Sequence, residues 1–482
     1  MSDITLVYPK TGMDEFARQP LSIMAVASPV INEGYSVEMV DTRVEDKYLE
    51  KVLASSKNGT VIGISAMTGT QISHGIRIAK AVREENPNIP IVWGGVHPSL
   101  LPKQTLEHEY VDYVVVGEGE QTFLELVRKI EKGEEPKNVD GVGYSKGKKL
   151  ILNRQRAFLP SDELDILPWD LIDFKKYVSE KSGSVIAMQT SRGCPFRCTY
   201  CYNCEFNKRS WRAMSAERFV EELDAIRKET KIGKIIFWDD NFFVNLLRSE
   251  DIIKTLQDQG IGWEADIRPD LMSRLKEDFL NKMRDSKCTA VFLGAESGSQ
   301  RILDFVKKDT KVEQIVKSVQ YCKQYGISPI LSFMTGFPTE TPEERAETTS
   351  LMTKLQEIDD NAQVALAIFT PFPGTELYET SKEHGFVPPD SLEKWAEYVP
   401  TSTIARPWLS EREKVFLQDL AMISRLAFQF SRMEGFLKNP LLRYAGYLLH
   451  KFEQFRWRRQ FWALPVEIRA IQYIYRRRTK AA

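Results

Sequence analysis

Three cysteines with short, regular spacing are the residues of this chain best suited to chemistry. Cys194, Cys198 and Cys201 follow a strand-like apolar run at residues 184–188. Three thiolates at CxxxCxxC spacing on one loop can bind three corners of a cubic [4Fe–4S] cluster and leave the fourth iron without a protein ligand. Electron-transfer clusters mostly use four cysteines, so an open iron indicates a site that binds a substrate or co-substrate. The spacing therefore predicts a reactive iron–sulfur cluster.

Zinc is the competing interpretation of these thiolates. Zinc sites usually bring paired CxxC knuckles or nearby histidines, and none of the five histidines lies near this loop in the sequence. Cys204 follows in the expected next helix and could complete a four-thiolate set, but we expect it not to be a ligand. Cys288 and Cys322 lie in apolar surroundings and are typical of inert core thiols. Six cysteines in this length are too few for a disulfide scaffold and fit a reducing compartment.

The elements that must position this loop repeat a strand–helix pattern. Six strand-like runs, each separated from the next by a helix-length segment, lie at residues 184–188, 234–238, 262–267, 290–293, 330–335 and 365–369. Six βα repeats are enough for an open barrel but fewer than the eight that close one. We therefore expect an α/β fold with a partial (β/α)6 barrel over residues 184–390.

A second α/β pattern precedes the barrel, over residues 1–135. Its five strand-like runs lie at residues 4–8, 36–41, 60–65, 90–95 and 113–117. Strands that alternate with helices predict a parallel, doubly wound, Rossmann-like sheet, which binds ligands at the carboxyl ends of its strands. Three of these strand ends consist largely of glycine and other small residues, at residues 63–69, 94–97 and 117–120. Glycine lets the backbone approach a large flat ligand closely, so this edge is a predicted binding site.

The remaining segments are a linker and a C-terminal region. Residues 136–183 predict an ordered linker with a short hairpin, and residues 391–482 predict a mainly helical region. Residues 451–482 hold nine Lys or Arg against two Glu, interleaved with aromatic residues. Such a segment fits an interfacial membrane contact. It also fits nucleic-acid binding, or a helix packed on the barrel with solvated arginines.

Length and charge limit the remaining possibilities. A chain of 482 residues predicts two or three domains, and a net charge of −1 argues against a protein that binds nucleic acid over its whole surface. No run of about 18 uncharged apolar residues is present to span a bilayer, and the N-terminus does not resemble a secretory signal. We expect a cytoplasmic protein, with peripheral contact at the inner face of the membrane through the tail.

The cysteine segment, residues 191–201, resembles the radical S-adenosylmethionine (SAM) superfamily. The signature of that superfamily is CxxxCxΦC with an aromatic residue before the last cysteine, here Tyr200. Further strand-end motifs match its pattern in order, at residues 238–242, 263–268, 294–299 and 336–341, so that the resemblance spans residues 184–375. It implies that Cys194, Cys198 and Cys201 bind the cluster. It also implies SAM contacts from Tyr200, Asp239, Arg268, Glu296 and Gly336.

The N-terminal pattern resembles the cobalamin-binding domain that precedes the radical domain in one large subfamily. The resemblance rests on residues 63–65, 94–98 and 116–120. It implies cobalamin contacts from Ser65, Thr68, Gly94, Gly95, Gly117 and Glu118. The DxHxxG string that supplies an axial histidine in other corrinoid domains is absent, so a base-off cobalamin without a histidine ligand is implied. His97 follows the fourth strand of this domain. We expect His97 to be a turn residue that either contacts the edge of the corrin ring or does not contact the corrin at all.

Together the two resemblances imply a cobalamin-dependent radical SAM enzyme, with no catalytic side chain of the protein assigned. One electron from a reducing donor such as flavodoxin or ferredoxin cleaves SAM to methionine and a 5′-deoxyadenosyl radical, which abstracts hydrogen from an unactivated carbon. Methylcobalamin, formed with a second SAM, then delivers a methyl group. The substrate is expected to be a small molecule, a lipid or a tetrapyrrole.

Three other functions stay open from the sequence. The same layout occurs in the anaerobic oxidative cyclase of bacteriochlorophyll synthesis and in other enzymes that form C–C bonds on lipids or tetrapyrroles. A methylthiotransferase acting on tRNA is disfavoured, because that family has extra N-terminal cysteines and a C-terminal β-barrel. From another class, the chain could be an iron–sulfur electron carrier or sensor without a reaction of its own.

Overall fold

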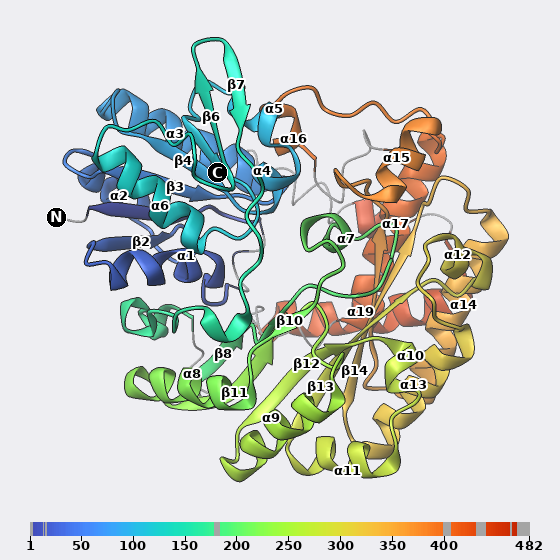
Figure 1. Cartoon of the computed structure of the whole chain (residues 1–482). Coiled ribbons are helices and arrows are strands. Elements are labelled where there is room, and N and C mark those ends of the chain that lie inside the picture. Colours follow the sequence, from blue (N-terminus) through green and yellow to red (C-terminus); the bar gives the residue numbers. More distant parts are fainter. Residues whose placement is uncertain are drawn as a thin grey trace. The chain divides into compact units, whose positions relative to one another are not determined.

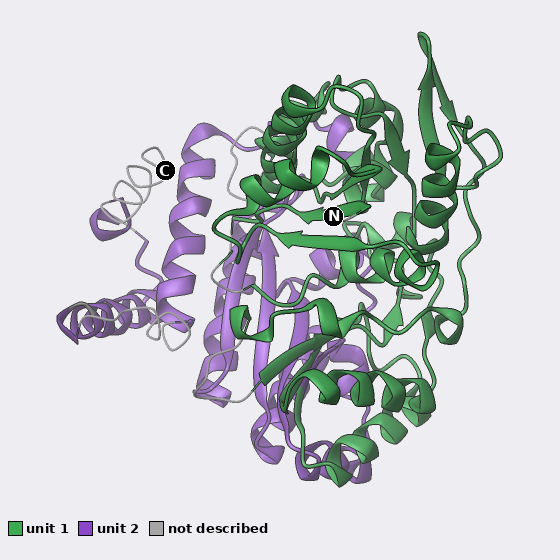
Figure 2. Ribbon diagram, turned by 90° about the vertical axis from the view of Figure 1, so that its left-hand side faces the viewer, with its two compact units in different colours: residues 1–263, 372–379, 387–402 green, residues 264–371, 380–386, 403–482 purple. Residues whose placement is uncertain are grey.

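The computed structural model describes residues 3–12, 14, 17–177, 184–398, 406–429, 440–462 and 465–469. Figure 1 shows the elements. The chain divides into two compact units, which are coloured separately in Figure 2. Unit 1 comprises residues 1–263, 372–379 and 387–402, and unit 2 comprises residues 264–371, 380–386 and 403–482.

Unit 1 begins with a seven-stranded sheet. Its strands are β1 (Ile4–Tyr8), β2 (Val37–Asp41), β3 (Val61–Ser65), β4 (Ile91–Gly94), β5 (Tyr113–Val115), β6 (Val142–Lys146) and β7 (Lys149–Leu152), in the order β2-β1-β3-β4-β5-β6-β7. The first five strands are parallel, and the β6–β7 hairpin adds to β5 in antiparallel pairing. The predicted doubly wound domain is confirmed, with its order reversing between β1 and β3.

The helices that connect these strands bury one apolar face each. They are α1 (Leu21–Asn32), α2 (Tyr48–Ser56), α3 (Thr70–Glu85), α4 (Val96–Leu100), α5 (Pro102–Leu106) and α6 (Glu120–Glu131). Phe123 and Val127 are one turn apart on α6 and pack with Leu6 of β1 in the core. Gly63 of β3 permits this packing, because a Cβ there would lie 2.7 Å from a methyl group of Leu6.

The linker is ordered over its described part. It contains the single-turn helices η2 (Ser161–Glu163), η3 (Trp169–Leu171) and η4 (Phe174–Lys176). The Trp169 side chain is buried, stacks on Phe174 with 6.2 Å between ring centroids, and donates from Nε1 to Glu222. Buried side chains of the linker such as Trp169 and Phe174 therefore fix its path along unit 1. Residues 178–183 lie outside the described residues.

A second sheet has six strands whose order follows the chain. They are β8 (Ser184–Met188), β11 (Ile232–Phe237), β12 (Gly262–Ile267), β13 (Cys288–Glu296), β14 (Ser328–Thr335) and β15 (Gln363–Ile368). Pairing is parallel between β8 and β11 in unit 1, and between β13, β14 and β15 in unit 2. This arrangement confirms the predicted open (β/α)6 barrel. Its boundaries at residues 184 and 390 stay a prediction.

Helices follow the strands of this sheet. They are α7 (Asn203–Phe206), α8 (Ala216–Glu229), α9 (Leu246–Asp258), α10 (Pro269–Met272), α11 (Glu277–Asp285), α12 (Gln300–Phe305), α13 (Val312–Tyr325) and α14 (Pro342–Ile358). A short ribbon, β9 (Ser191–Arg192) with β10 (Arg212–Ala213), brackets the cysteine segment. Thr341 and Glu344 form a reciprocal capping box that fixes the start of α14.

The C-terminal region is helical over its described part, as predicted. Its helices are α16 (Leu392–Ala396), α17 (Glu411–Phe428) and α19 (Pro440–Arg458), and α15 (Glu376–Glu383) precedes them within the range predicted for the barrel. In the described part of the chain, no helix is both long enough and apolar enough to cross a bilayer. Residues 463, 464 and 470–482 of the predicted basic tail lie outside the described residues.

Candidate functional site

The cysteine loop, defined as residues 191–204, is anchored at its start by Asp239. This carboxylate directly follows β11 and accepts from the backbone N–H of Thr190 at 2.7 Å and from the Thr190 and Ser191 hydroxyls at 2.8 and 2.5 Å. Burial raises the pKa of Asp239 to about 6, although these donors favour its ionised form. Asp239 therefore holds the loop against the adjacent strand.

Asp240 holds the next turn of the loop. Its carboxylate accepts from the backbone N–H of Gly193 at 2.8 Å. Gly193 has φ +85°, and a Cβ at this position would lie 1.9 Å from the carbonyl oxygen of Ser210. Only glycine fits both requirements, so the residue before Cys194 lets the loop pass directly over the chain that returns from α7.

The predicted cluster ligands lie together on this loop. The backbone N–H of Cys201 donates to the Cys198 carbonyl at 3.2 Å in a tight turn. Burial, the largest cause, raises the pKa of the Cys201 thiol, and the negative charges of Cys198 and Cys204 add to the shift. These surroundings disfavour a bare thiolate, whereas a cationic iron centre stabilises one. The donor set therefore fits an iron–sulfur cluster.

Cys204 has partners within the loop. Its thiol donates to the carbonyl oxygens of Phe196 at 3.4 Å and Cys198 at 3.5 Å. Cys288 and Cys322 are buried in the core, as predicted. In the described residues, no three His, Cys, Asp or Glu side chains form a group that could hold a single metal ion.

The predicted cobalamin contacts lie at the carboxyl ends of β3, β4 and β5. We call these loops, residues 65–69, 94–97 and 116–120, the glycine rim. Gly95 has φ +97° and a Cβ there would lie 2.8 Å from the Ala66 carbonyl oxygen, whereas Gly117, with φ +85°, has no atom within 4 Å of an added Cβ. The first two loops of the rim are therefore packed closely against each other, whereas Gly117 in the third has open space beside it.

Ser22 belongs to the same edge of the sheet, although no sequence pattern indicates it. Its hydroxyl lies 3.3 Å from that of Ser65. Ser22 is in the first turn of α1, after β1, and Ser65 is the last residue of β3, so both lie where the strand order reverses. Ligands of doubly wound sheets bind at this reversal. The structure therefore adds a polar side chain to the predicted rim.

His97 is fully buried in α4. Its Nδ1 lies 3.0 Å from the Thr68 hydroxyl, and its ring meets Trp395 edge-on with 5.7 Å between centroids. Burial lowers the pKa of His97 to about 3, so the ring is neutral at physiological pH. Thr68 and His97 thus connect two loops of the rim. His97 lies in α4 rather than in a turn, and its relation to the corrin edge stays a prediction.

Glu118 joins the glycine rim to the cysteine loop within unit 1. Its Oε1 lies 2.8 Å from Arg212 Nη2 and 3.3 Å from Arg192 Nη1, and its Oε2 lies 2.9 Å from Arg212 Nη1. Arg192 also contacts Glu120 at 2.7 Å. Burial opposes ionisation of Glu120, but Arg192 outweighs it and lowers the pKa of Glu120. We call these four residues the rim–loop network.

The SAM contacts predicted in unit 2 lie in buried ion pairs and turns. Arg268 Nε donates to Asp270 at 2.8 Å. Glu296 has φ +63° at the end of β13 and pairs with Lys308 at 2.8 Å, with both side chains buried. Lys308 lies outside the strand-end motifs, so the sequence gives no signal for it.

Gly336 forms the turn after β14 with φ +81°. Its backbone N–H donates to the Glu340 carboxylate at 2.5 Å, and its carbonyl oxygen accepts from Trp408 Nε1 at 3.0 Å. Burial raises the pKa of Glu340. The turn is therefore fixed on both sides, and the roles of these residues toward SAM stay a prediction.

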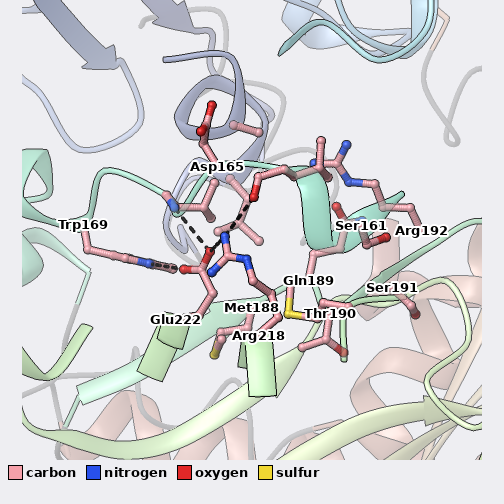
Figure 3. Close-up of a pocket in the computed structure, with 15 residues that line it drawn as sticks. Ser161, Asp165, Trp169, Met188, Gln189, Thr190, Ser191, Arg192, Arg218 and Glu222 are labelled. Carbon is pink, nitrogen blue, oxygen red and sulfur yellow. Dashed lines mark hydrogen bonds and ion pairs between the residues drawn. The ribbon is translucent and has the colours of Figure 1, made fainter. Parts of the chain in front are cut away.

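A small cavity of about 40 Å³ lies beside the start of the cysteine loop (Figure 3). Glu222 forms part of its wall and accepts from Trp169 Nε1 at 2.7 Å and from Arg218 Nη2 at 3.2 Å. Burial raises the pKa of Glu222. The volume holds a few water molecules, so neither SAM nor a corrinoid fits in this cavity.

Known proteins identify the family of the chain. The family profile of the radical SAM superfamily matches residues 188–352, and that of the B12 binding domain matches residues 15–127. An uncharacterized methyltransferase of Pyrococcus horikoshii is 35% identical over 367 residues, which are 75% of this chain and 78% of the relative. The chain belongs to the radical SAM superfamily.

Two further proteins resemble this radical SAM protein over most of its length. The anaerobic magnesium-protoporphyrin IX monomethyl ester cyclase of Rubrivivax gelatinosus is 29% identical over 353 residues, which are 71% of this chain and 61% of the cyclase. The structure of OxsB, a cobalamin-dependent S-adenosylmethionine radical enzyme with aqua-cobalamin bound, has a TM-score of 0.71 at 19% identity and covers 95% of this chain and 72% of its own. The latter similarity shows the fold.

Family membership confirms several predictions from the sequence. This radical SAM protein is an enzyme, and its cofactors are a [4Fe–4S] cluster, SAM and cobalamin. The iron–sulfur interpretation of the cysteine loop is thereby favoured over zinc. The individual ligands and contacts stay predictions, with Cys194, Cys198 and Cys201 in the cysteine loop and Tyr200 between the last two.

Proposed function

We propose that this radical SAM enzyme transfers a methyl group to an unactivated carbon of a hydrophobic small molecule, with a lipid or a tetrapyrrole as the substrate class. The observation that carries the proposal is the rim–loop network. Through it, the predicted cobalamin edge and the predicted cluster loop are in direct contact within one compact unit. When bound, the cluster and SAM supply a radical that abstracts hydrogen, and cobalamin supplies the methyl group.

The residues of the chain bind, orient and shield these groups. Asp239 and Asp240 fix the start of the cysteine loop at two successive points, Thr190 and Gly193. At the predicted cobalamin edge, Gly95 keeps two loops of the glycine rim in close contact, and Gly117 has open space beside it. Rigid support of this kind reduces the reorganisation that binding and reaction require.

The test begins with cofactor content. Anaerobically reconstituted protein supplied with hydroxocobalamin should contain near-equimolar cobalamin and about four iron atoms per chain. With a reductant and SAM labelled in its methyl group, the labelled methyl should appear in the product together with 5′-deoxyadenosine. Iron without cobalamin would end the methyl-transfer proposal, although hydrogen abstraction would survive that result.

Oxidative ring formation is the second candidate, because the Rubrivivax relative is a cyclase. Such a reaction would release 5′-deoxyadenosine but leave the labelled methyl group out of the product. Mass spectrometry of products from tetrapyrrole and lipid substrates therefore separates the two reactions. In both, a reducing protein such as flavodoxin or ferredoxin is the proposed electron donor.

A further inference from the structure

One face of α19 exposes an apolar stripe. We call it the α19 stripe; its residues are Leu441, Tyr444, Leu448, Phe452 and Phe455. Their spacing of three or four residues places them along one side of the helix. Each is between 46% and 79% exposed. Large apolar side chains that gather on one exposed face usually mark an interaction surface.

The opposite face of the same helix is buried within unit 2. Trp457 meets Phe428 of α17 edge-on with 5.0 Å between ring centroids, and the helix is drawn in red in Figure 1. Glu453 and Arg456 are also buried, 3.7 Å apart, on this packed side. The side of α19 that carries Trp457 is therefore the side that packs on α17.

Among the described residues 440–462, the exposed charged side chains are all basic. Arg443, Lys451, Arg458 and Arg459 are exposed. Glu453 is the one acidic residue of the sequence between positions 440 and 462, and it is buried. Lys451 lies 5.6 Å from the ring centroid of Tyr447, which is also exposed. Basic and aromatic side chains beside an apolar stripe are the composition of helices that lie in the surface of an anionic bilayer.

We propose that the α19 stripe binds an anionic membrane surface, with the helix lying parallel to the bilayer. The apolar side chains enter the acyl boundary, the tyrosine hydroxyls stay at the headgroups, and the basic side chains contact lipid phosphates. A second copy of the chain is a poorer occupant, because two stripes packed face to face bring Lys451 and Arg459 of both copies together. The surface is independent of the reaction proposed above.

The test measures co-sedimentation of the full chain with vesicles. Wild-type protein should bind vesicles that contain phosphatidylglycerol, bind pure phosphatidylcholine vesicles much less, and dissociate as salt rises. Leu441→Glu should reduce binding at least about fivefold, since it removes an inserted side chain and adds a repelled charge. Arg458→Ala with Arg459→Ala should weaken binding about fivefold for each charge removed.

A matched control excludes general effects of the substitutions. Leu247 of α9 is 77% exposed and Leu441 is 79% exposed, so Leu247→Glu makes the same chemical change on another helix. This control should bind vesicles as the wild type does, and thermal melting should show all variants folded. Equal loss in both variants, or no binding by the wild type, would overturn the proposal. So would a dimer in analytical ultracentrifugation that Leu441→Glu dissociates, because the stripe would then be a self-association surface.

Discussion

Replacing Glu118 by glutamine tests whether the rim–loop network holds the cysteine loop. The carboxylate receives three N–H groups from Arg192 and Arg212, at 2.8, 2.9 and 3.3 Å. Glutamine keeps one acceptor oxygen and turns an NH2 group toward guanidinium groups that can only donate. The substitution therefore leaves two arginines with Glu120 as their nearby carboxylate, at almost unchanged side-chain volume.

The cost follows from the burial of the network. Loss of one partner of a buried ion pair costs about 3–5 kcal/mol. The Glu118 and Arg212 side chains are each 14% exposed, and Glu120 still pairs with Arg192, so solvent and the remaining carboxylate reduce the loss. We expect a decrease of ~2–3 kcal/mol in the stability of unit 1. Because a large domain loses about 2–4 °C per kcal/mol, Tm should fall by about 4–12 °C.

The assay compares melting of the apo protein with that of a control variant. Glu125 of α6 pairs with Arg156 at 2.6 Å, with side chains 37% and 22% exposed. Exposed pairs contribute about 0–1 kcal/mol, so Glu125→Gln should lower Tm by no more than about 4 °C. Iron content and the effect of SAM on the EPR spectrum of the reduced cluster should change in Glu118→Gln and stay as in the wild type in Glu125→Gln.

Two results would refute this reasoning. Equal Tm values for the two variants would show that Glu118 does not stabilise the loop. An unchanged Tm with weaker cobalamin binding would show instead that Glu118 acts on the corrinoid, which is the role that the sequence predicts for it.

Three further predictions follow from single residues. Cys198→Ala should abolish SAM cleavage, whereas Cys204→Ala should retain it because the Cys204 thiol donates to loop carbonyls. Release of 5′-deoxyadenosine measures SAM cleavage in both variants. Loss of cleavage in Cys204→Ala would contradict the prediction that Cys204 is not a cluster ligand. Gly193→Ala should cost ~3 kcal/mol and most of the bound iron, through its positive φ and its backbone clash. Gly133→Ala, with positive φ and open space, should cost only about 1–2 kcal/mol in the same denaturation assay. Burial lowers the pKa of His97 from 6.5 to about 3. Between these two values the unfolded state binds a proton at His97 and the folded state does not, so the stability of the fold decreases as the pH drops below about 6.5. His97→Gln should therefore remove ~1–2 kcal/mol of the stability lost between pH 7 and pH 5, and an unchanged pH profile would refute this account.

The sequence by itself determined the parts of this protein that depend on local pattern. Strand-like runs placed the strands within a few residues, because the alternation of strand and helix leaves a short-range signal. The cysteine loop was found from spacing alone, since three thiolates on one loop must be close in space. The glycine rim followed from the rule that parallel strands end at one edge of their sheet.

Only the tertiary structure decided which side chains meet across long stretches of chain. Glu118 lies 94 residues from Arg212 in the sequence, so its place in the rim–loop network could not be read from either motif. Asp239 is predicted to contact SAM, but its described hydrogen bonds come from Thr190 and Ser191 at the start of the cysteine loop. Glu296 forms an ion pair with Lys308, which belongs to no motif.

The α19 stripe shows the same limit on a helix surface. Basic and aromatic residues at residues 451–482 indicated a membrane contact, but a helical pattern does not say which face is packed. The contact of Trp457 with Phe428 fixes the buried face and leaves the face of Leu441 and Phe455 exposed. Spacing along the chain fixes what is close in sequence, whereas burial and pairing depend on how distant segments fold against each other.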